Sequence, residues 1–168
     1  MKQLFRRVAL LCLLMAPVAA FAQTAVTENT NHAKMLSGSN WVEIQNKRIV
    51  YDFWRKVFEA GHVELTPLYM HRDYIQHNPT IPNGRDAFIS FLRGFRPNPT
   101  PIKSRVDGPL VAITADGDLV TLVWVMTLPN PNKPGETYTT TWFDMFRVVE
   151  GRIKEHWDPA TINPVPAG

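Results

Sequence analysis

Two short stretches of the sequence combine acidic, imidazole, amide and aromatic side chains, a mixture that suits proton transfer inside a pocket. The first is Tyr74-Ile75-Gln76-His77-Asn78-Pro79, and the second is 142–147 followed by Glu155-His156-Trp157-Asp158. His77 is a candidate general acid or base, because imidazole titrates close to neutral pH. An equally good interpretation is that His77 and Asn78 only hydrogen-bond the turn into Pro79.

Asp144 is the leading candidate for an acid/base residue. The two-residue period of a strand places it on one face with Tyr138, Trp142, Phe146 and Val148. A carboxylate is costly to bury in its charged form among aromatic rings, so such a group is a candidate base or acid. The alternative is a structural salt bridge from Asp144 to Arg147 or Arg105.

Glu150-Gly151 predicts a hairpin, and the type of turn decides which residue lies across from Asp144. A plain two-residue turn would place Trp157 there. A type I turn with Gly151 as a bulge would shift the pairing by one residue and place His156 there. We favour the second register, because Gly after an acidic residue suits the left-handed bulge position. It would also give a carboxylate–imidazole pair.

We therefore expect catalytic roles for Asp144, His77 and His156. The residues expected to contact the substrate are Tyr74, Asn78, Trp54, Trp142, Phe146, Trp157 and Asp158.

No metal ion and no cofactor are expected at this site. The histidines at 62, 71, 77 and 156 are scattered, and no two have a ligand spacing such as i, i+4 on a helix. The sequence also contains no phosphate-binding loop, nucleophile elbow or dinucleotide fingerprint.

The elements that must position these residues are helices in the first half of the chain and strands in the second. One helix is predicted to begin after Asn40 and end before Gly61, another to begin at Asn83 as N-cap, and a shorter helical turn to lie between them. Alternating patterns predict strands at 104–114, 119–128, 137–149 and 152–158. This order indicates an α+β fold, with a curved antiparallel sheet wrapped around three N-terminal helices.

Residues 1–22 resemble a cleavable signal peptide. Lys2, Arg6 and Arg7 precede an apolar run that is too short to span a bilayer, and Ala20-Phe21-Ala22 predicts cleavage between Ala22 and Gln23. The mature protein is therefore expected to be periplasmic or secreted, with no membrane contact after cleavage. Residues 23–39 are predicted to be a flexible N-terminal segment, 40–160 the folded domain and 161–168 a tail.

Removal of this leader also changes the charge balance. The chain has 18 basic and 15 acidic residues, and three of the basic ones lie in the leader, so the mature chain is formally neutral. Nucleic acid is not an expected partner. The single cysteine, Cys12, is in the leader, which excludes a disulfide or a thiol nucleophile in the mature protein.

The segment from Lys47 to Phe91, with its Tyr-Asp-Phe-Trp and Tyr-Ile-Gln-His-Asn-Pro motifs, resembles the first half of the SnoaL-like polyketide cyclases. These belong to the nuclear-transport-factor-2-like superfamily. The segments 144–153 and 155–158 resemble their closing hairpin. The resemblance covers about 40–160. It implies a cystatin-like roll with a cone-shaped sheet, a pocket at its open end, and a homodimer formed through the sheet.

In the cyclases that this chain resembles, an aspartate on the penultimate strand is the acid/base in an aldol ring closure without metal or organic cofactor. Asp144 matches that position. The strand 122–126 departs from the cyclases because it lacks the histidine that they carry. We expect a cofactor-independent cyclase, isomerase or lyase acting on a small apolar carbonyl compound. The alternative is a non-catalytic periplasmic module for ligand binding or dimerisation.

Overall fold

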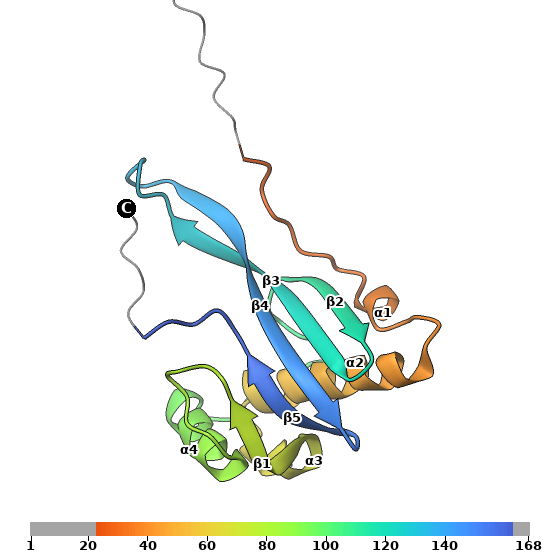
Figure 1. Cartoon of the computed structure of the whole chain (residues 1–168). Helices are drawn as coiled ribbons and strands as arrows, with labels where there is room; N and C mark the ends of the chain where they lie inside the picture. Colours follow the sequence, from red (N-terminus) through yellow and green to blue (C-terminus); the bar gives the residue numbers. More distant parts are fainter. Residues whose placement is uncertain (1–22, 163–168) are drawn as a thin grey trace, which may run out of the picture.

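The computed structural model describes residues 23–162, so the predicted signal peptide 1–22 and the last residues of the predicted tail lie outside the described residues. It has an α+β fold in which helices cover one face of a single curved sheet (Figure 1). The helices are α1 (His32–Met35), α2 (Trp41–Phe53), η1 (Trp54–Glu59), η2 (Val63–Leu65), α3 (Thr66–Tyr69) and α4 (Arg85–Phe95). The strands are β1 (Met70–Gln76), β2 (Leu110–Asp116), β3 (Leu119–Pro129), β4 (Thr137–Val149) and β5 (Arg152–Trp157).

The sheet has the order β1-β5-β4-β3-β2. Strands β2 to β5 form an antiparallel meander, as the sequence predicted, whereas β1 pairs parallel to β5 and makes the sheet mixed. Strand β1 was not predicted, because its sequence places three polar residues, His71, Arg72 and Asp73, in succession and so hides the alternation. The strand predicted to begin at 104 begins only at Leu110.

The first long helix begins where the sequence indicates. The Asn40 side chain accepts hydrogen bonds from the backbone N–H groups of Val42 and Glu43, and its own amide donates to the Glu43 carboxylate. The helix then changes to a π-helix at Trp54–Glu59 and ends before Gly61, whose φ of 78° is left-handed.

Helix α4 is capped differently from the prediction. Gly84 is its N-cap, and the side-chain oxygen of Asn83 accepts instead from the backbone N–H of Gln76. Asn83 therefore ties the start of this helix to the end of β1.

The hydrophobic core lies between the helices and the inner face of the sheet. Fully buried side chains from α2, β1, α4 and the sheet include Val50, Met70, Leu92, Leu122 and Ile153. The core leaves room at one end of this layer, where the side chains are aromatic and a cavity opens.

Residues 23–39, predicted as a flexible segment, make specific contacts with the sheet. The backbone N–H of Asn29 donates to the Leu110 carbonyl, and that of Val26 donates to the Thr139 hydroxyl. Helix α1 follows, and His32 contacts the Tyr51 hydroxyl. Within the described part of the chain, no helix combines the length and apolar character that a membrane crossing requires.

Candidate functional site

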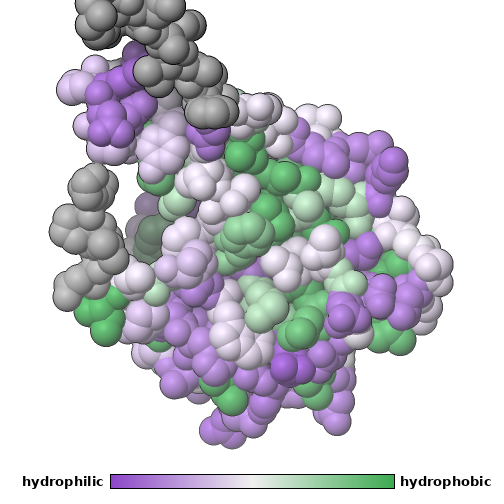
Figure 2. Space-filling model, turned by 45° about the horizontal axis from the view of Figure 1, so that its top comes forward, coloured by the Kyte–Doolittle hydropathy of each residue, from purple (hydrophilic) through white to green (hydrophobic). Residues whose placement is uncertain are grey.

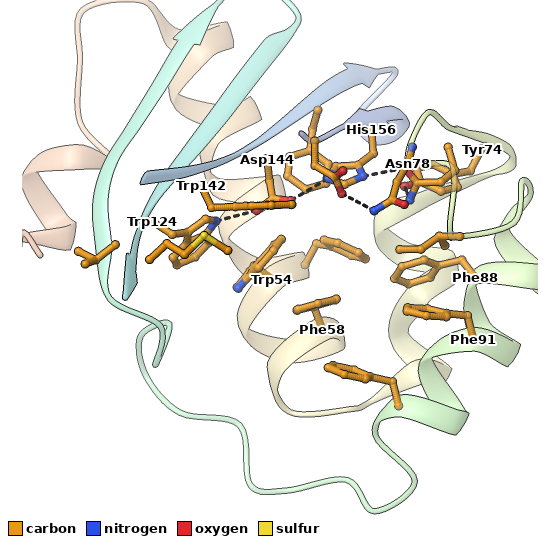
Figure 3. Close-up of a pocket in the computed structure, with 18 residues that line it drawn as sticks. Trp54, Phe58, Tyr74, Asn78, Phe88, Phe91, Trp124, Trp142, Asp144 and His156 are labelled. Carbon is orange, nitrogen blue, oxygen red and sulfur yellow. Dashed lines mark hydrogen bonds and ion pairs between the residues drawn. The ribbon is translucent and has the colours of Figure 1, made fainter. Parts of the chain in front are cut away.

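A cavity of about 390 Å³ lies between the inner face of the sheet and helices α2, η1 and α4 (Figure 3). Its wall is mostly aromatic, and its polar side chains come from β1, β4, β5 and the segments that follow β1 and β5. The aromatic residues are Phe53, Trp54, Phe58, Tyr74, Phe88, Phe91, Phe95, Trp124, Trp142 and Phe146, and the other polar or charged residues are Gln76, Asn78, Asp144, His156 and Asp158.

Strand β4 directs Asp144 into this cavity through the two-residue alternation that the sequence predicted. Trp142, Asp144 and Phe146 face inward, whereas Phe143 and Met145 lie on the outer face. Asp144 is 5% exposed.

Within residues 23–162, no arginine forms an ion pair with Asp144. Arg147 lies on the opposite face of β4 and binds Asp118 and Glu155. The alternative of a structural salt bridge from Asp144 to an arginine is therefore wrong.

Neither predicted register describes the β4–β5 hairpin. The turn at Glu150-Gly151 is the plain two-residue turn, with Val149 opposite Arg152, but an irregularity between Arg147 and Val148 shifts the pairing. Phe146 lies opposite His156, and Met145 lies opposite Trp157. The extra residue in β5 reverses the inward and outward faces, so that both Ile153 and His156 point inward.

His156 and Asp144 nevertheless meet, as diagonal rather than directly opposite neighbours. His156 Nε2 lies 3.0 Å from Asp144 Oδ1, and both residues are buried (Figure 3). The indole N–H of Trp124 donates to the other carboxylate oxygen, Oδ2, at 2.8 Å. Both oxygens of Asp144 thus have a partner, and both partners line the cavity.

One backbone N–H fixes the direction of the hydrogen bonds around His156. The N–H of Asn78 donates to Gln76 Oε1, which identifies that atom as the amide oxygen. His156 Nδ1 lies 2.8 Å from the same oxygen and must therefore carry a hydrogen. Nε2 then faces Asp144 either as a lone pair or as a second N–H. Because two lone pairs would repel at 3.0 Å, a proton must lie between His156 and Asp144.

The same amide fixes the role of Tyr74. Gln76 Nε2 donates to the Tyr74 hydroxyl oxygen at 3.0 Å, so the O–H of Tyr74 is free to donate to another group. Burial raises the pKa of Tyr74 far above its ordinary value, and the negative charges of Asp158 and Asp144 raise it further. Tyr74 therefore stays a neutral phenol in the physiological pH range and acts as a hydrogen-bond donor at the cavity wall.

Asp158 supplies a second carboxylate just after β5. Its Oδ2 accepts from the Asn78 amide at 2.7 Å, and its Oδ1 accepts from the backbone N–H of Ala160. Ligand atoms of Asp144, His156 and Asp158 lie within 4.8 Å of one another. The structure thus brings together an acid–imidazole–acid group that could move a proton or hold a cation. The spacing of the histidines in the sequence had not predicted a metal site here.

Two of the predicted site residues do not reach the cavity. The His77 side chain is 41% exposed and lies 3.1 Å from Glu155, and its ring stacks on Trp157 at 4.7 Å. Trp157 lies on the outer face because it pairs with Met145. The shift in β5 that turns His156 inward also turns Trp157 outward. His77, just after the neighbouring strand β1, lies outside the cavity with Trp157. The predicted catalytic role of His77 and the predicted substrate contact of Trp157 are therefore not supported.

The remaining predicted residues, Trp54, Tyr74, Asn78, Trp142, Phe146 and Asp158, all line the cavity. Trp54 stacks on Trp124 with 4.8 Å between ring centroids, and its ring packs at a tilt against Phe58 with 4.4 Å between centroids. The π-helix brings Trp54 and Phe58 onto one side of the cavity, because residues four apart are nearly aligned in the wider helix.

The sequence analysis missed Gln76 and Trp124, which hold His156 and Asp144 in place. Both could have been identified from strand alternation. Gln76 is two residues from Tyr74 on β1, and Trp124 lies opposite Trp142 in the β3–β4 register. Identifying Gln76 required recognition of β1, which the polar residues of that strand obscured.

Comparison with known proteins relates this chain to one family. The profile of the SnoaL-like domain matches residues 50–156, which contain most of the cavity wall and both members of the Asp144–His156 pair. Among curated proteins, none matches the chain significantly.

Several solved structures match this chain at low sequence identity. A protein from Acidithiobacillus ferrooxidans named as a polyketide cyclase is 21% identical with a TM-score of 0.48, over 68% of this chain and 86% of that one. A protein from Jannaschia sp. CCS1 named as a SnoaL-like polyketide cyclase is 18% identical with a TM-score of 0.49, over 73% and 91%. An LEH-like epoxide hydrolase of M. tuberculosis is 18% identical with a TM-score of 0.48, over 69% and 82%.

Proposed function

This chain belongs to the SnoaL-like domain family, and we propose that it is an acid/base enzyme for a small apolar carbonyl compound. The reaction class is aldol-type cyclisation, isomerisation or a related lyase reaction, and the reacting groups are side chains of the protein. The observation that carries this proposal is the buried Asp144–His156 pair, with a proton between its members, at the wall of an aromatic cavity. Apolar walls select the body of the substrate, and the polar wall selects its carbonyl group.

In the proposed first step, the Asp144 carboxylate removes a proton from the carbon next to the carbonyl group. The C–H bond breaks, an O–H bond forms on Asp144, and the electron pair moves to the carbonyl oxygen to give an enolate. Trp124 and His156 orient the carboxylate for this transfer, since each binds one of its oxygens. In the second step the enolate attacks a second carbonyl carbon, whose oxygen takes the proton from Asp144 as the C=O double bond opens, or the enolate takes that proton back at another position.

Tyr74 is the proposed donor to the developing enolate oxygen. Its O–H is not used within the Gln76 network, and it remains protonated because its pKa is raised by burial. A fixed neutral donor in a cavity with little water stabilises such an oxygen without a charge of its own. Asp144 and Tyr74 would thus act on opposite ends of the same C–C=O unit.

Exchange of α-hydrogens with solvent tests this proposal before the natural substrate is known. NMR in D₂O would follow deuterium incorporation into small bicyclic ketones such as 2-tetralone, with wild-type protein and with Asp144→Asn. The introduced amide can still accept from Trp124 and can donate to a neutral His156, so we expect the fold and the melting temperature to be retained. Loss of the base should slow exchange by about 10²–10⁴-fold.

Asp73→Asn is the matched control, because this aspartate lies on the surface and binds Lys154. It should exchange the ketone as fast as the wild type. Equal rates for wild type and Asp144→Asn, or a ketone that binds in the cavity without any exchange, would contradict the proposed role of Asp144.

A non-catalytic binding module is the second candidate, and one observation favours it. Both oxygens of Asp144 already accept hydrogen bonds inside the protein, as expected for a purely structural carboxylate. In that case Asp144→Leu would bind apolar ligands more tightly than the wild type, because a charge is removed from an apolar site. The enzyme proposal expects weaker binding of ketones in this variant, since their oxygen loses the polar wall.

We also propose that the protein is exported and that its leader ends at Ala22. The proposal depends on the basic, apolar and small-residue order of residues 1–22. Intact-mass measurement of the protein recovered from its native cells tests it. A chain that starts at Gln23 and is found outside the cytoplasm is expected, and a full-length cytoplasmic chain would contradict export.

A further inference from the structure

The polar wall of the cavity carries acidic charge that no basic side chain balances. Two carboxylates, Asp144 and Asp158, and one imidazole, His156, face the cavity, and none of the described residues that line it is a lysine or arginine. Whether the proton between His156 and Asp144 belongs to the imidazole or to the carboxylic acid, the three groups together carry one negative charge. Buried charge without a partner is costly, so this wall attracts a cation or protons.

The geometry of the pair suits coordination of a metal ion. Two ligand atoms at about 2.1 Å from an ion lie about 3.0 Å apart at a right angle and about 3.4 Å apart at the tetrahedral angle that Zn²⁺ prefers. His156 Nε2 and Asp144 Oδ1 are 3.0 Å apart, and the ligand atoms of Asp158 complete a group within 4.8 Å. Asp158 is less buried than the other two.

Each of the three ligand side chains also forms a hydrogen bond with a neighbouring residue that orients it, as metal ligands in proteins do. Trp124 donates to the outer oxygen of Asp144 at 2.8 Å, and Asn78 donates to Asp158 at 2.7 Å. His156 donates its Nδ1–H to the Gln76 oxygen, which leaves Nε2 as the coordinating nitrogen. This arrangement fixes both the tautomer and the ring orientation, and it leaves the cavity side of the group open to water or to a ligand.

We propose that Asp144, His156 and Asp158 form a binding site for one divalent first-row transition ion, for which Zn²⁺ is the probe. One nitrogen and two carboxylate ligands favour Zn²⁺, Mn²⁺ or Fe²⁺ over Mg²⁺, which prefers an all-oxygen shell. The ion takes the place of the proton between His156 and Asp144, so binding releases that proton and strengthens as pH rises. This metal site does not depend on the proposed reaction, because that reaction uses the Asp144–His156 pair without a metal ion.

Isothermal titration calorimetry of Zn²⁺ into the mature protein, purified without a histidine tag, tests the site. Titrations in two buffers of different ionisation enthalpy would give the number of protons released. We expect one ion per chain, about one proton released per ion near neutral pH, and at least a tenfold preference for Zn²⁺ over Mg²⁺. Asp158→Asn should weaken Zn²⁺ binding by about 10–100-fold.

Two controls separate this site from adventitious binding. His62→Gln removes the exposed His62–Glu64 pair, and Asp73→Asn removes a surface carboxylate, so neither should change the affinity. Co²⁺ gives a second readout, since visible absorption of the wild-type complex should be lost in His156→Gln. The proposal is overturned if Zn²⁺ does not saturate the protein below about 1 mM. It is also overturned if His62→Gln abolishes binding, or if Asp158→Asn and His156→Gln bind as the wild type does.

Discussion

At the scale of single residues, the pattern of hydrogen bonds at the site depends on the side-chain amide of Gln76. Gln76 receives a backbone N–H from Asn78 and the Nδ1–H of His156 on its oxygen, and it donates to Tyr74 from its nitrogen. This assigns a direction to each hydrogen bond from Tyr74 to His156 and requires one proton between His156 and Asp144. A proton donor and a carboxylate are therefore held at the same wall in defined states, which a set of independent side chains would not achieve.

The raised pKa of Tyr74 predicts a loss of stability in alkaline solution. Burial, and then the charges of Asp158 and Asp144, raise this pKa in the folded protein, whereas an unfolded tyrosine ionises near pH 10. The folded state therefore binds the proton more tightly. Its contribution is complete below about pH 10 and is lost as pH rises above that value. When the pH is raised from about 8 to about 11, the unfolding free energy of Tyr74→Phe should fall by about 1 kcal/mol less than that of the wild type.

Urea unfolding of Tyr74→Phe and of the wild type, at about pH 8 and again at about pH 11, measures this difference in unfolding free energy. The exposed Tyr138 provides the control, since Tyr138→Phe should lose as much stability as the wild type. If Tyr74→Phe and the wild type fall in parallel, the hydroxyl of Tyr74 is not kept neutral by its surroundings.

At the scale of elements, the β4–β5 hairpin decides which side chains reach the cavity. Its turn has two residues, Glu150 with φ of 47° and Gly151 with φ of 74°, and the irregularity in β5 then brings both Ile153 and His156 to the inner face. A regular β5 would direct Trp157 inward and His156 outward. The chemistry of the site therefore depends on a single extra residue in a strand of six.

The turn itself can be improved, because a type I′ turn prefers Asn-Gly and only small or amide residues adopt left-handed φ at low cost. Glu150→Asn should raise the unfolding free energy by about 0.5–1 kcal/mol. The exposed Glu136 is the control, since Glu150 is the only non-glycine residue with positive φ in the described part of the chain. Chemical unfolding of both variants measures the effect, and a Glu150→Asn protein less stable than Glu136→Asn would show that the turn is not strained.

The sequence predicted the class of fold and strands β3, β4 and β5, and most of the candidate site residues do line the cavity. These predictions depend on local periodicity, and strand β4 shows the clearest alternation in the chain. The sequence did not predict β1, because parallel pairing with β5 is a long-range contact between distant segments. It also could not predict the irregularity in β5, since the backbone choice there depends on how Ile153 and His156 fit the core. The irregularity turns Trp157 outward, and His77, which was proposed for its imidazole chemistry alone, stacks on Trp157 there.

At the scale of the whole molecule, the helices and the cavity occupy the inner face of the sheet, and the outer face carries an exposed aromatic side chain. Figure 2 shows apolar residues gathered on one face of the molecule, with polar residues around them. Phe143, on the outer face of β4, is 47% exposed. We propose that two copies of the chain associate through this face, which leaves the cavities of both copies accessible.

Phe143→Glu should convert the proposed dimer to a monomer, because it places a charge in the centre of the interface. Sedimentation velocity measures the change. Leu68→Glu is the control, since Leu68 is 66% exposed on α3, away from the outer face of β4. A monomeric wild type, or dissociation of the Leu68→Glu protein as well, would contradict an interface on this face.

The most direct test of the account is the protonation of the His156 ring, which ¹⁵N NMR of the selectively labelled protein reports. The network predicts that Nδ1 carries a hydrogen at neutral pH and that Nε2 shares the proton with Asp144. The ring N–H signal should be absent in His156→Gln and unchanged in His77→Gln. An unprotonated Nδ1 at neutral pH, or an Nε2 signal that is the same in Asp144→Asn as in the wild type, would contradict the account.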